Sequence, residues 1–543
     1  MKKFLLICCA ILSITAGAIA FKFSDQDLFL KITNALDLFG SVFREVTLHY
    51  VDPVDPMSFV NDGTKAMLSS LDPYSEILDD SGEDDMELLS SNTYTGFGMI
   101  IGVIDDELTI MDIYPGYSAE KNGLKPGDRI CYVDSTFVLH DTTNIIRSYS
   151  RGAVGGKVRV SVLRPGKSDT IHVTLTRETI RVRSLGVTGM VNDSVGYLKI
   201  ERFSSGTKDE VKRVLAQFRR ENSKFSGLMI DLRGNPGGLL ESAVDVCDLF
   251  VPMKSTIVMT KGRNTEEERV YVSQYQPQEP DIPLAILIDG ESASASEVVA
   301  GAIQDLDRGI ILGSRSFGKG LVQTVKSLPG NKSLKLTTAR YYTPSGRCIQ
   351  RLPTYTEDIA VEGKEVLFKT SNGRPVTSRH GIDPDTSFEA EKPLRLLELL
   401  EEEQLLFRFV SEYCANIDTL SKDWKAGDKD FKKLQQWLAK QQDLPLPEPY
   451  SLLDKSDSIA QKNGYTLGYA KQLKEIRNAS KKDMLKGLNA IKSQLLRKLT
   501  LSVQTRYRSH KELIPLLLQN DNLIQKTAIL LLNKNYGTLL SPR

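Results

Sequence analysis

Strand-like and helix-like segments alternate between residues 194 and 344, and this alternation restricts the fold more than any other feature of the sequence. Short apolar runs typical of strands occupy 195–200, 227–232, 284–288, 309–312, 321–325 and 334–342. Segments with helical apolar spacing occupy 208–220, 239–250 and 296–305. A chain that alternates in this way buries its strands in a sheet that helices cover. We therefore predict an α/β layered domain in this part of the chain.

The flanking segments have different periodicities. Residues 28–71 and the chain after Leu394 carry apolar residues at helical spacing, whereas 94–180 alternates apolar and polar residues as strands do. Acidic residues over 79–85 and the sequence DLPLPEP over 443–449 are typical of linkers. The predicted architecture is α+β and multidomain, with an export signal over 1–20, an N-terminal helical segment over 21–84, a β-rich domain over 85–180, the α/β core over 181–395 and a C-terminal helical domain over 396–543.

The C-terminal domain has one stripe of apolar residues at helical spacing, namely Leu488, Ile491, Leu495, Leu499 and Val503. Basic residues occur in the same region, among them Lys482, Lys486 and Arg497. We expect a core-packed helix with a solvated basic face, and a helix on a membrane surface is the alternative.

The first twenty residues have the pattern of an export signal. Lys2 and Lys3 form a positive start, residues 4–14 are apolar, and Ala18-Ile19-Ala20 is a small-x-small cleavage site. The apolar run is short for a membrane span. We therefore expect an exported protein of the periplasm or cell envelope, with an uncleaved N-terminal membrane anchor as the alternative.

Charge and residue counts argue against several classes of protein. Lys and Arg total 70 against 69 Asp and Glu, a balance that argues against a nucleic-acid binder. Only five histidines occur and they are far apart in sequence, so we expect no metal and no other cofactor. The cysteines after the signal are scattered, which favours free thiols over disulfides. They are Cys131, Cys247, Cys348 and Cys414.

The first candidate for chemistry is Asp289–Glu297, with the sequence DGESASASE, between a buried apolar run and a helical segment. A serine at such a strand-to-helix turn lies at the helix N-terminus, where free backbone amides and the positive end of the helix dipole can stabilise an oxyanion. Taken alone, a serine in this position is more often a helix cap than a nucleophile.

Two further turns have an unusual composition. In Ser316–Gly320 (SFGKG) a lysine lies between glycines and apolar runs, where desolvation would lower its pKa and leave a neutral amine base; an exposed turn lysine is the alternative. The overlapping match of 313–319 to a phosphate-binding loop is not favoured, because a strand and not a helix follows it. In Asp231–Gly238 (DLRGNPGG) tandem glycines can turn their amides toward a bound group, although a tight turn alone also requires glycine.

Together, these motifs and three others resemble the C-terminal processing peptidases, also called tail-specific proteases. The resemblance runs from about residue 30 to residue 385. The segments that carry it are YTGFGMIIGV (94–103), SAEKNGLKPGDRI (118–130), DLRGNPGG (231–238), SASASEVVAGAIQD (292–305), SFGKGLVQ (316–323) and TARYYTPSGRCIQ (338–350). It implies a PDZ domain followed by a Ser-Lys peptidase core related to the crotonase and ClpP folds.

The resemblance assigns roles to particular residues. It implies that Ser294 is the nucleophile, that Lys319 is the general base, and that Gln323 orients Lys319. It places the oxyanion-binding amides at Ala295, Gly237 and Gly238. Asp305 matches a position that some members need, and we expect a structural role for it. A neutral lysine that does the work of a histidine accounts for the scarcity of histidine.

The resemblance also implies a peptide site in the PDZ domain. The loop over 94–99 resembles one whose amides bind a terminal carboxylate while the peptide adds to the sheet as a strand. The residues implied to bind substrate are Gly96, Phe97, Gly98 and Met99. Residues 143–149 resemble the helix on the other wall of the groove. Packing of this domain on the core as a regulator is the alternative.

The predicted function is that of an exported serine endopeptidase, a hydrolase that recognises substrate C-termini through its PDZ domain and cleaves peptide bonds through an acyl-enzyme. The expected partners are proteins or peptides with free C-termini and no nucleic acid, and a homo-oligomer is left open. The alternative is a non-catalytic PDZ scaffold on a peptidase fold, and the presence of Ser294, Lys319 and Gln323 argues against it.

Overall fold

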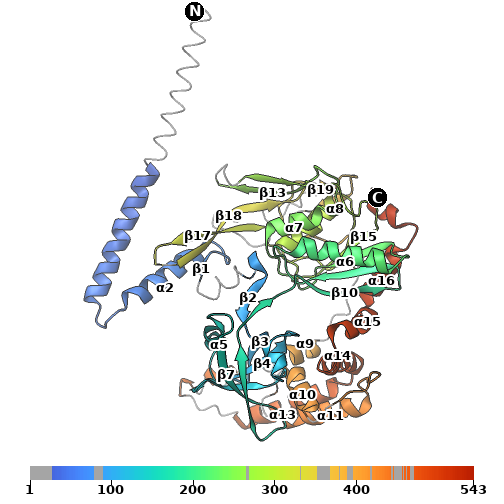
Figure 1. Ribbon diagram of the computed structural model, residues 1–543. Coiled ribbons are helices and arrows are strands. Elements are labelled where there is room, and N and C mark those ends of the chain that lie inside the picture. Colours follow the sequence, from blue (N-terminus) through green and yellow to red (C-terminus); the bar gives the residue numbers. More distant parts are fainter. Residues whose placement is uncertain are drawn as a thin grey trace, which may run out of the picture. The chain divides into compact units, whose positions relative to one another are not determined.

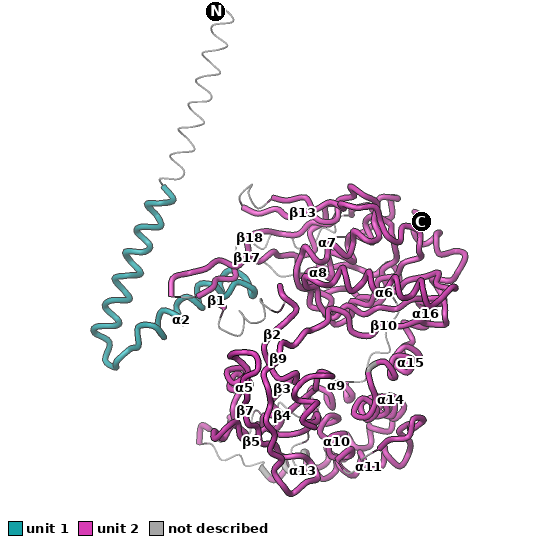
Figure 2. Tube along the Cα trace, in the orientation of Figure 1, with its two compact units in different colours: residues 1–77 teal, residues 78–543 magenta. Residues whose placement is uncertain are grey.

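The computed structural model forms two compact units, residues 1–77 and 78–543, which Figure 2 distinguishes by colour. It describes residues 27–78, 90–263, 268–330, 332–350, 367–377, 380–387, 395–415, 419–441 and 470–542, with a few single positions between them. The predicted export signal, the acidic linker and all but one residue of the proline-rich linker lie outside the described residues.

Unit 1 contains two helices, one over 27–49 and α2 (Pro56–Ser69). Asp55 caps α2 by accepting a hydrogen bond from the Ser58 N–H at 2.8 Å, and Pro56 starts the helix. Proline suits this position because the N–H that it lacks would have no partner within the helix. The helical spacing predicted over 28–71 is confirmed here. The short strand β1 (Glu76–Leu78) lies at the boundary between the two units.

The β-rich domain begins unit 2. Its main sheet has the antiparallel order β3-β4-β5-β7-β8 with β6 beside β5, and β2 pairs separately with β9. Val158, Val160 and Val162 alternate along β7 and are buried in one core, as the periodicity predicts. The elements are β2 (Thr93–Gly96), β3 (Met99–Ile104), β4 (Glu107–Ile113), α4 (Ser118–Lys121), β5 (Arg129–Val133), β6 (Thr136–Phe137), α5 (Thr143–Ser150), β7 (Lys157–Leu163), β8 (Thr170–Thr176) and β9 (Glu178–Arg181).

The central domain is built on a six-stranded sheet of order β10-β11-β12-β15-β16-β21. Strand β10 runs antiparallel to β11, and the other neighbours are parallel. The elements are β10 (Leu185–Val191), β11 (Val195–Ile200), α6 (Thr207–Glu221), β12 (Gly227–Asp231), α7 (Leu240–Cys247), β15 (Leu284–Ile288), α8 (Ala295–Asp305), β16 (Ile310–Gly313) and β21 (Thr386–Ser387). The predicted α/β layered domain is confirmed.

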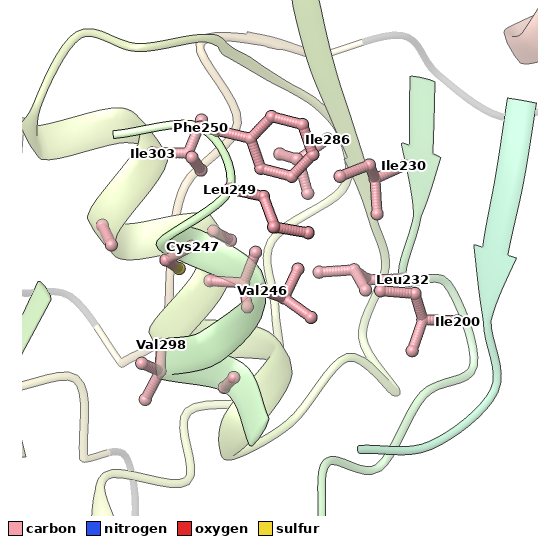
Figure 3. Packing of buried hydrophobic residues seen from close by; sticks show 14 of the residues in the cluster. Ile200, Ile230, Leu232, Val246, Cys247, Leu249, Phe250, Ile286, Val298 and Ile303 are labelled. Atoms are coloured by element: carbon pink, nitrogen blue, oxygen red, sulfur yellow. The ribbon is translucent and has the colours of Figure 1, made fainter. Parts of the chain in front are cut away.

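Both faces of this sheet are buried, as the uninterrupted apolar sequence LAILI of β15 requires. Ile286 and its neighbours on one face pack against α7 and α8, a core that Figure 3 shows from close by. Ala285 and Leu287 face the other side, where α15 (His510–Asn520) and α16 (Asn522–Leu531) cover the sheet (Figure 1). The last helices of the chain are therefore a layer of the central domain, which their sequence pattern did not indicate.

A second, antiparallel sheet contains strands β17, β18, β13 and β14. Their bounds are β13 (Thr256–Gly262), β14 (Arg269–Val272), β17 (Leu321–Leu328) and β18 (Lys332–Tyr342), and β19 (Leu367–Lys369) pairs with β20 (Pro375–Thr377) elsewhere. Strands β10, β13 and β14 are not among those predicted. In β10 the glycines Gly186 and Gly189 interrupt the apolar pattern, which removes the sequence signal for a strand.

The remaining C-terminal helices form a core of their own. The predicted stripe from Leu488 to Val503 is buried within it, whereas Lys482, Lys486 and Arg497 are exposed, so core packing with a solvated basic face is confirmed. The stripe does not lie on a single helix, because the chain turns between Gly487 and Lys492. No helix in the described part of the chain has the length and apolar character of a membrane span. The helices are α9 (Arg395–Glu402), α10 (Leu405–Cys414), α11 (Asp428–Lys440), α13 (Ala470–Gly487) and α14 (Lys492–Gln504), and the 3₁₀ helix η2 (Tyr536–Leu540) follows α16.

Candidate active site

Ser294 lies where the chain leaves β15 and enters α8, at the N-cap position of the helix. Its backbone has φ +56° and ψ −114°, a conformation that residues with a side chain rarely adopt and that costs on the order of 1–3 kcal/mol. Its side chain is buried to 7% relative exposure. The predicted position of this serine at a strand-to-helix turn is confirmed, and the backbone strain goes beyond what a simple helix cap needs.

The glycine-rich turn Asp231–Gly238 packs directly against this serine. A Cβ atom added to Gly237 would lie 2.9 Å from Ser294 Cβ and 2.8 Å from the Ala293 carbonyl oxygen, which is too close for any side chain. Gly237 also has φ +109°, which glycine adopts without strain. Glycine is therefore required here for close approach to Ser294 as well as for the turn.

Asn235, which the sequence analysis did not single out, ties the two turns together. Its backbone carbonyl accepts hydrogen bonds from Ala293 N–H at 3.1 Å and from Ser296 Oγ at 2.9 Å. Its side chain is fully buried, donates to the Ile200 carbonyl at 2.8 Å and accepts from the Gly237 N–H at 2.8 Å. The Gly237 amide is thus already occupied, which corrects the expectation that it faces the oxyanion.

The amides of Gly238 and Ala295 remain available. Neither N–H donates to another group in the described part of the structure. Ala295 is the first residue of α8, where an N–H has no partner within the helix and where the helix dipole is positive. A Cβ atom added to Gly238 would lie 2.0 Å from the Phe203 carbonyl oxygen, so this position also accepts only glycine.

Glu297 joins the turn that carries Lys319 to the turn that carries Ser294. Its carboxylate is fully buried and accepts four hydrogen bonds. Its Oε2 accepts from the backbone N–H of Ser294 at 2.9 Å and of Lys319 at 2.8 Å. Its Oε1 accepts from Ser316 Oγ at 2.6 Å and from Gly318 N–H at 2.7 Å. Two segments that are distant in sequence are therefore fixed on one side chain.

The electrostatics of Glu297 reflect these contacts. Burial raises the pKa of its carboxyl above the usual range, and the hydrogen bonds from Ser316, Gly318, Lys319 and Ser294 oppose the rise. The sequence contains a signal for this residue, because Glu three positions after an N-cap serine is the pattern of a capping box. The capping box alone would not have indicated the contacts to the lysine turn.

Lys319 and Gln323 lie at the start of β17. Lys319 is partly buried, and a strand follows it, as expected. The ladder between β17 and β18 is irregular between Val322 and Gln323, and the Gln323 side-chain amide donates to Thr337 Oγ1 at 3.3 Å. The side-chain oxygen of Gln323 takes no part in this bond and can accept another hydrogen bond.

Tyr341, on β18, is a further polar group at the site. Its backbone N–H donates to the Gly320 carbonyl at 2.8 Å, and its side chain is 5% exposed. Burial raises the pKa of its hydroxyl to about 12, and a hydrogen bond with the Ser294 side chain opposes the rise. The tyrosine therefore lies next to Ser294 and stays protonated at neutral pH.

Asp305, at the far end of α8, has a different environment. It forms an ion pair with the fully buried Arg347 at 2.7 Å and accepts a hydrogen bond from the Ser345 N–H at 3.0 Å. Both partners belong to the turn after β18, so the ion pair joins that turn to α8. In the described residues no group of His, Cys, Asp or Glu is arranged to hold a metal ion, and Cys131, Cys247, Cys348 and Cys414 are free thiols.

The loop over 94–99 has two backbone N–H groups that are not used within the described part of the chain. The carbonyls of Phe97 and Gly98 accept hydrogen bonds from Ala119 N–H and Tyr114 N–H, whereas their own N–H groups donate to nothing in the described part of the chain. Gly98 has φ +77°, and a Cβ atom there would lie 2.3 Å from Tyr117 Cβ. Among the described strands β3 pairs only with β4, and α5 contacts β3.

These features define a serine peptidase core with a PDZ domain before it. Residues 194–361 match Peptidase family S41, residues 94–175 match the PDZ domain, and residues 396–531 match a family described as "Probable PDZ-protease, C-terminal helical domain". The chain belongs to the carboxy-terminal processing proteases, which are serine-type endopeptidases. The resemblance found in the sequence and the predicted fold class are both confirmed.

Two relatives and one solved structure illustrate the similarity. The carboxy-terminal-processing protease of Bartonella bacilliformis is 34% identical over 326 residues, which cover 60% of this chain and 74% of the relative. The carboxyl-terminal-processing protease of Synechocystis sp. is 31% identical over 54% of this chain and 69% of its own length. The structure of a photosystem II D1 C-terminal processing protease is 27% identical with a TM-score of 0.36, covering 65% of this chain and 88% of that one.

Proposed function

We propose that this protein is an exported endopeptidase that cleaves through a Ser294–Lys319 dyad and selects substrates by their free C-termini. The observation that carries the dyad is the shared carboxylate of Glu297, which holds the backbone of both residues. Hydrogen bonds to one shared carboxylate keep the two turns at a fixed separation. A nucleophile and its general base require such a fixed separation.

The proposed reaction has two halves. The neutral Lys319 amine takes the proton of the Ser294 hydroxyl as its oxygen attacks the substrate carbonyl, and the Gly238 and Ala295 amides stabilise the resulting oxyanion. The protonated lysine then gives that proton to the leaving amine, which leaves an acyl-enzyme. Water, deprotonated by the same lysine, hydrolyses the ester. Gln323 orients the lysine amine through its side-chain oxygen.

The proposed recognition step uses the PDZ domain. The terminal carboxylate of a protein or peptide would accept hydrogen bonds from the free amides of Phe97 and Gly98, while the chain adds beside β3. Gly96 and Met99 flank these two amides. Binding at the C-terminus raises the local concentration of the substrate chain at the core, so cleavage efficiency on long substrates depends on it.

Export and self-association complete the proposal. The first twenty residues support export to the periplasm or cell envelope, with a membrane anchor if they are not removed. A homo-oligomer is supported by the two helices of unit 1, whose apolar residues are largely exposed, including Phe29, Leu36 and Leu38 at 69%, 63% and 68%. The mass of the purified protein in solution, compared between the native chain and Leu36→Asp/Leu38→Asp, tests whether these helices form the contact.

The central experiment is proteolysis of an unfolded protein by the purified enzyme and by two variants of the same turn. Ser294→Ala should abolish cleavage while the unfolding midpoint stays close to that of the native protein. Ser292→Ala is the matched control, since it removes a hydroxyl that is hydrogen-bonded to the Leu232 carbonyl and should retain substantial activity. Cleavage by Ser294→Ala at the native rate would exclude the proposed nucleophile.

A further inference from the structure

The C-terminal helices contribute one charged side chain to the edge of the catalytic core. Asp521 lies between α15 and α16 and caps α16, because its Oδ1 accepts from the N–H groups of Leu523 at 2.9 Å and Ile524 at 3.1 Å. Its other oxygen, Oδ2, accepts from Arg233 Nη2 at 2.8 Å. The cap and the ion pair thus use different oxygens of one carboxylate.

Arg233 belongs to the turn Asp231–Gly238 that packs against Ser294. Its guanidinium also pairs with Asp231, with Nη2 2.6 Å from Oδ2 and Nε 3.0 Å from Oδ1, and the Tyr197 hydroxyl donates to the same carboxylate at 2.7 Å. Two carboxylates on different segments therefore fix both the position and the plane of the guanidinium. Burial alone would lower the pKa of Arg233, but the charges of Asp231 and Asp521 outweigh it and raise the pKa.

The surroundings of Arg233 leave it room to move if one partner is lost. A cavity of about 380 Å³ adjoins the pair, and its lining includes Lys199, Asp289 and Leu518 as well as Asp521 and Arg233. With Asp521 in place the guanidinium is held at the wall of this cavity. Without the charge of Asp521, Arg233 and the backbone of its turn lose the ion pair that ties them to the N-terminus of α16.

The constraint reaches the nucleophile in two short steps. Next to Arg233, the Gly234 N–H donates to Asp289 Oδ1 at 3.0 Å, which ties the turn to the segment that leads into the SASAS sequence. One residue further, Asn235 accepts from Ala293 N–H and Ser296 Oγ, on either side of Ser294. The turn then continues to the free amide of Gly238.

We propose that Asp521 is a positioning residue of the peptidase site: through Arg233 it fixes the turn Asp231–Gly238 and with it the Gly238 amide that faces the oxyanion. The inference rests on the proposed function. It gives the C-terminal helical segment a part in catalysis, because the last helices supply this carboxylate as well as apolar cover for the sheet.

The test is Asp521→Asn in the full chain, assayed with a short peptide substrate too small to reach the PDZ groove. Asparagine keeps an oxygen for the helix cap but offers Arg233 no charge. We expect kcat to fall about 10-fold while KM changes by less than about 2-fold, since the loss is one of transition-state stabilisation. If the variant is poorly folded, Asp521→Ser, which also caps, replaces it in the same comparison.

Three controls make the result specific. Asp428→Asn removes a carboxylate from the first turn of α11, where it pairs with Lys492 at 2.8 Å, and should leave kcat unchanged. Leu531→Ala, which truncates a buried side chain of α16, should lower the unfolding midpoint without lowering kcat well below that temperature. In an Arg233→Gln background, Asp521→Asn should have no further effect on kcat, because the two residues act as one unit.

Native kcat in Asp521→Asn, or an equal fall in kcat in Leu531→Ala, would overturn the inference. Additive losses in the Arg233→Gln background would overturn it as well. The proposed function fails on a separate outcome, which is cleavage of the same peptide by Ser294→Ala.

Discussion

The substitution Glu297→Gln tests the arrangement of the site most directly. The glutamine side chain has the same shape, but one of its two polar atoms is an NH₂ donor in place of an acceptor. The native carboxylate accepts from four donors, two on each oxygen. In its better orientation the amide keeps its oxygen on the N–H groups of Ser294 and Lys319 and turns its NH₂ group toward the Gly318 N–H and the Ser316 hydroxyl, which can rotate to accept.

The expected loss follows from these contacts. The Gly318 N–H is then a buried donor without an acceptor, which costs about 1–3 kcal/mol if the site does not relax. Relaxation would move the Lys319 turn or the Ser294 turn away from the side chain. Each 1.4 kcal/mol lost from transition-state stabilisation lowers the rate about 10-fold, so we expect kcat to fall by about 10- to 100-fold.

The assay measures kcat and KM on a short fluorogenic peptide together with urea unfolding. Both kcat and the free energy of unfolding should fall. Glu291→Gln is the matched control, because this exposed carboxylate lies in the same segment and makes none of these contacts to the lysine turn. A kcat within about 2-fold of the native value, with an unchanged unfolding midpoint, would show that the carboxylate does not hold the two turns.

The same variant has a signature in the pH dependence of stability. Burial raises the pKa of the Glu297 carboxyl in the folded chain, so the folded state binds a proton more readily than the unfolded state. The contribution of Glu297 to stability is then greatest below the ordinary Glu pKa and declines as the pH rises through the raised value. Glu297→Gln should remove this decline, which urea unfolding as a function of pH measures.

Three other results are expected. Lys319→Arg should abolish peptide cleavage, because a guanidinium stays charged and cannot accept the serine proton, whereas a His380→Gln variant should remain active; the reverse pattern would assign the base to histidine. A peptide with a free apolar C-terminus should bind the protein more tightly than its amidated form in a titration, and equal affinities would rule out carboxylate recognition by the PDZ loop. Asp305→Ala should lower the free energy of unfolding by about 3–5 kcal/mol in a urea titration, because it leaves the buried Arg347 without its counter-charge, and a loss of activity with no loss of stability would contradict a structural role.

Much of the site could be predicted because its parts are local in sequence. A serine between an apolar strand and a helix, a lysine between glycines and a glycine pair in a turn are each defined by a few adjacent residues. Their backbone conformations follow from residue type, since only glycine fits where Gly237 and Gly238 approach other chain segments. The order of these motifs along the chain was enough to indicate the family and the fold class.

The tertiary structure decided which groups meet. The Gly237 amide is not available to an oxyanion because it donates a hydrogen bond to the side chain of Asn235. No local sequence pattern distinguishes an amide with this partner from a free one. The role of Glu297 likewise depends on the approach of a turn some twenty residues further along the chain. Asp521 pairs with a residue 288 positions away, in a segment that reads as an independent helical domain. Sequence patterns report the conformation of neighbouring residues through backbone sterics and hydrophobic period, whereas contacts between distant segments form only when the apolar core has brought those segments together.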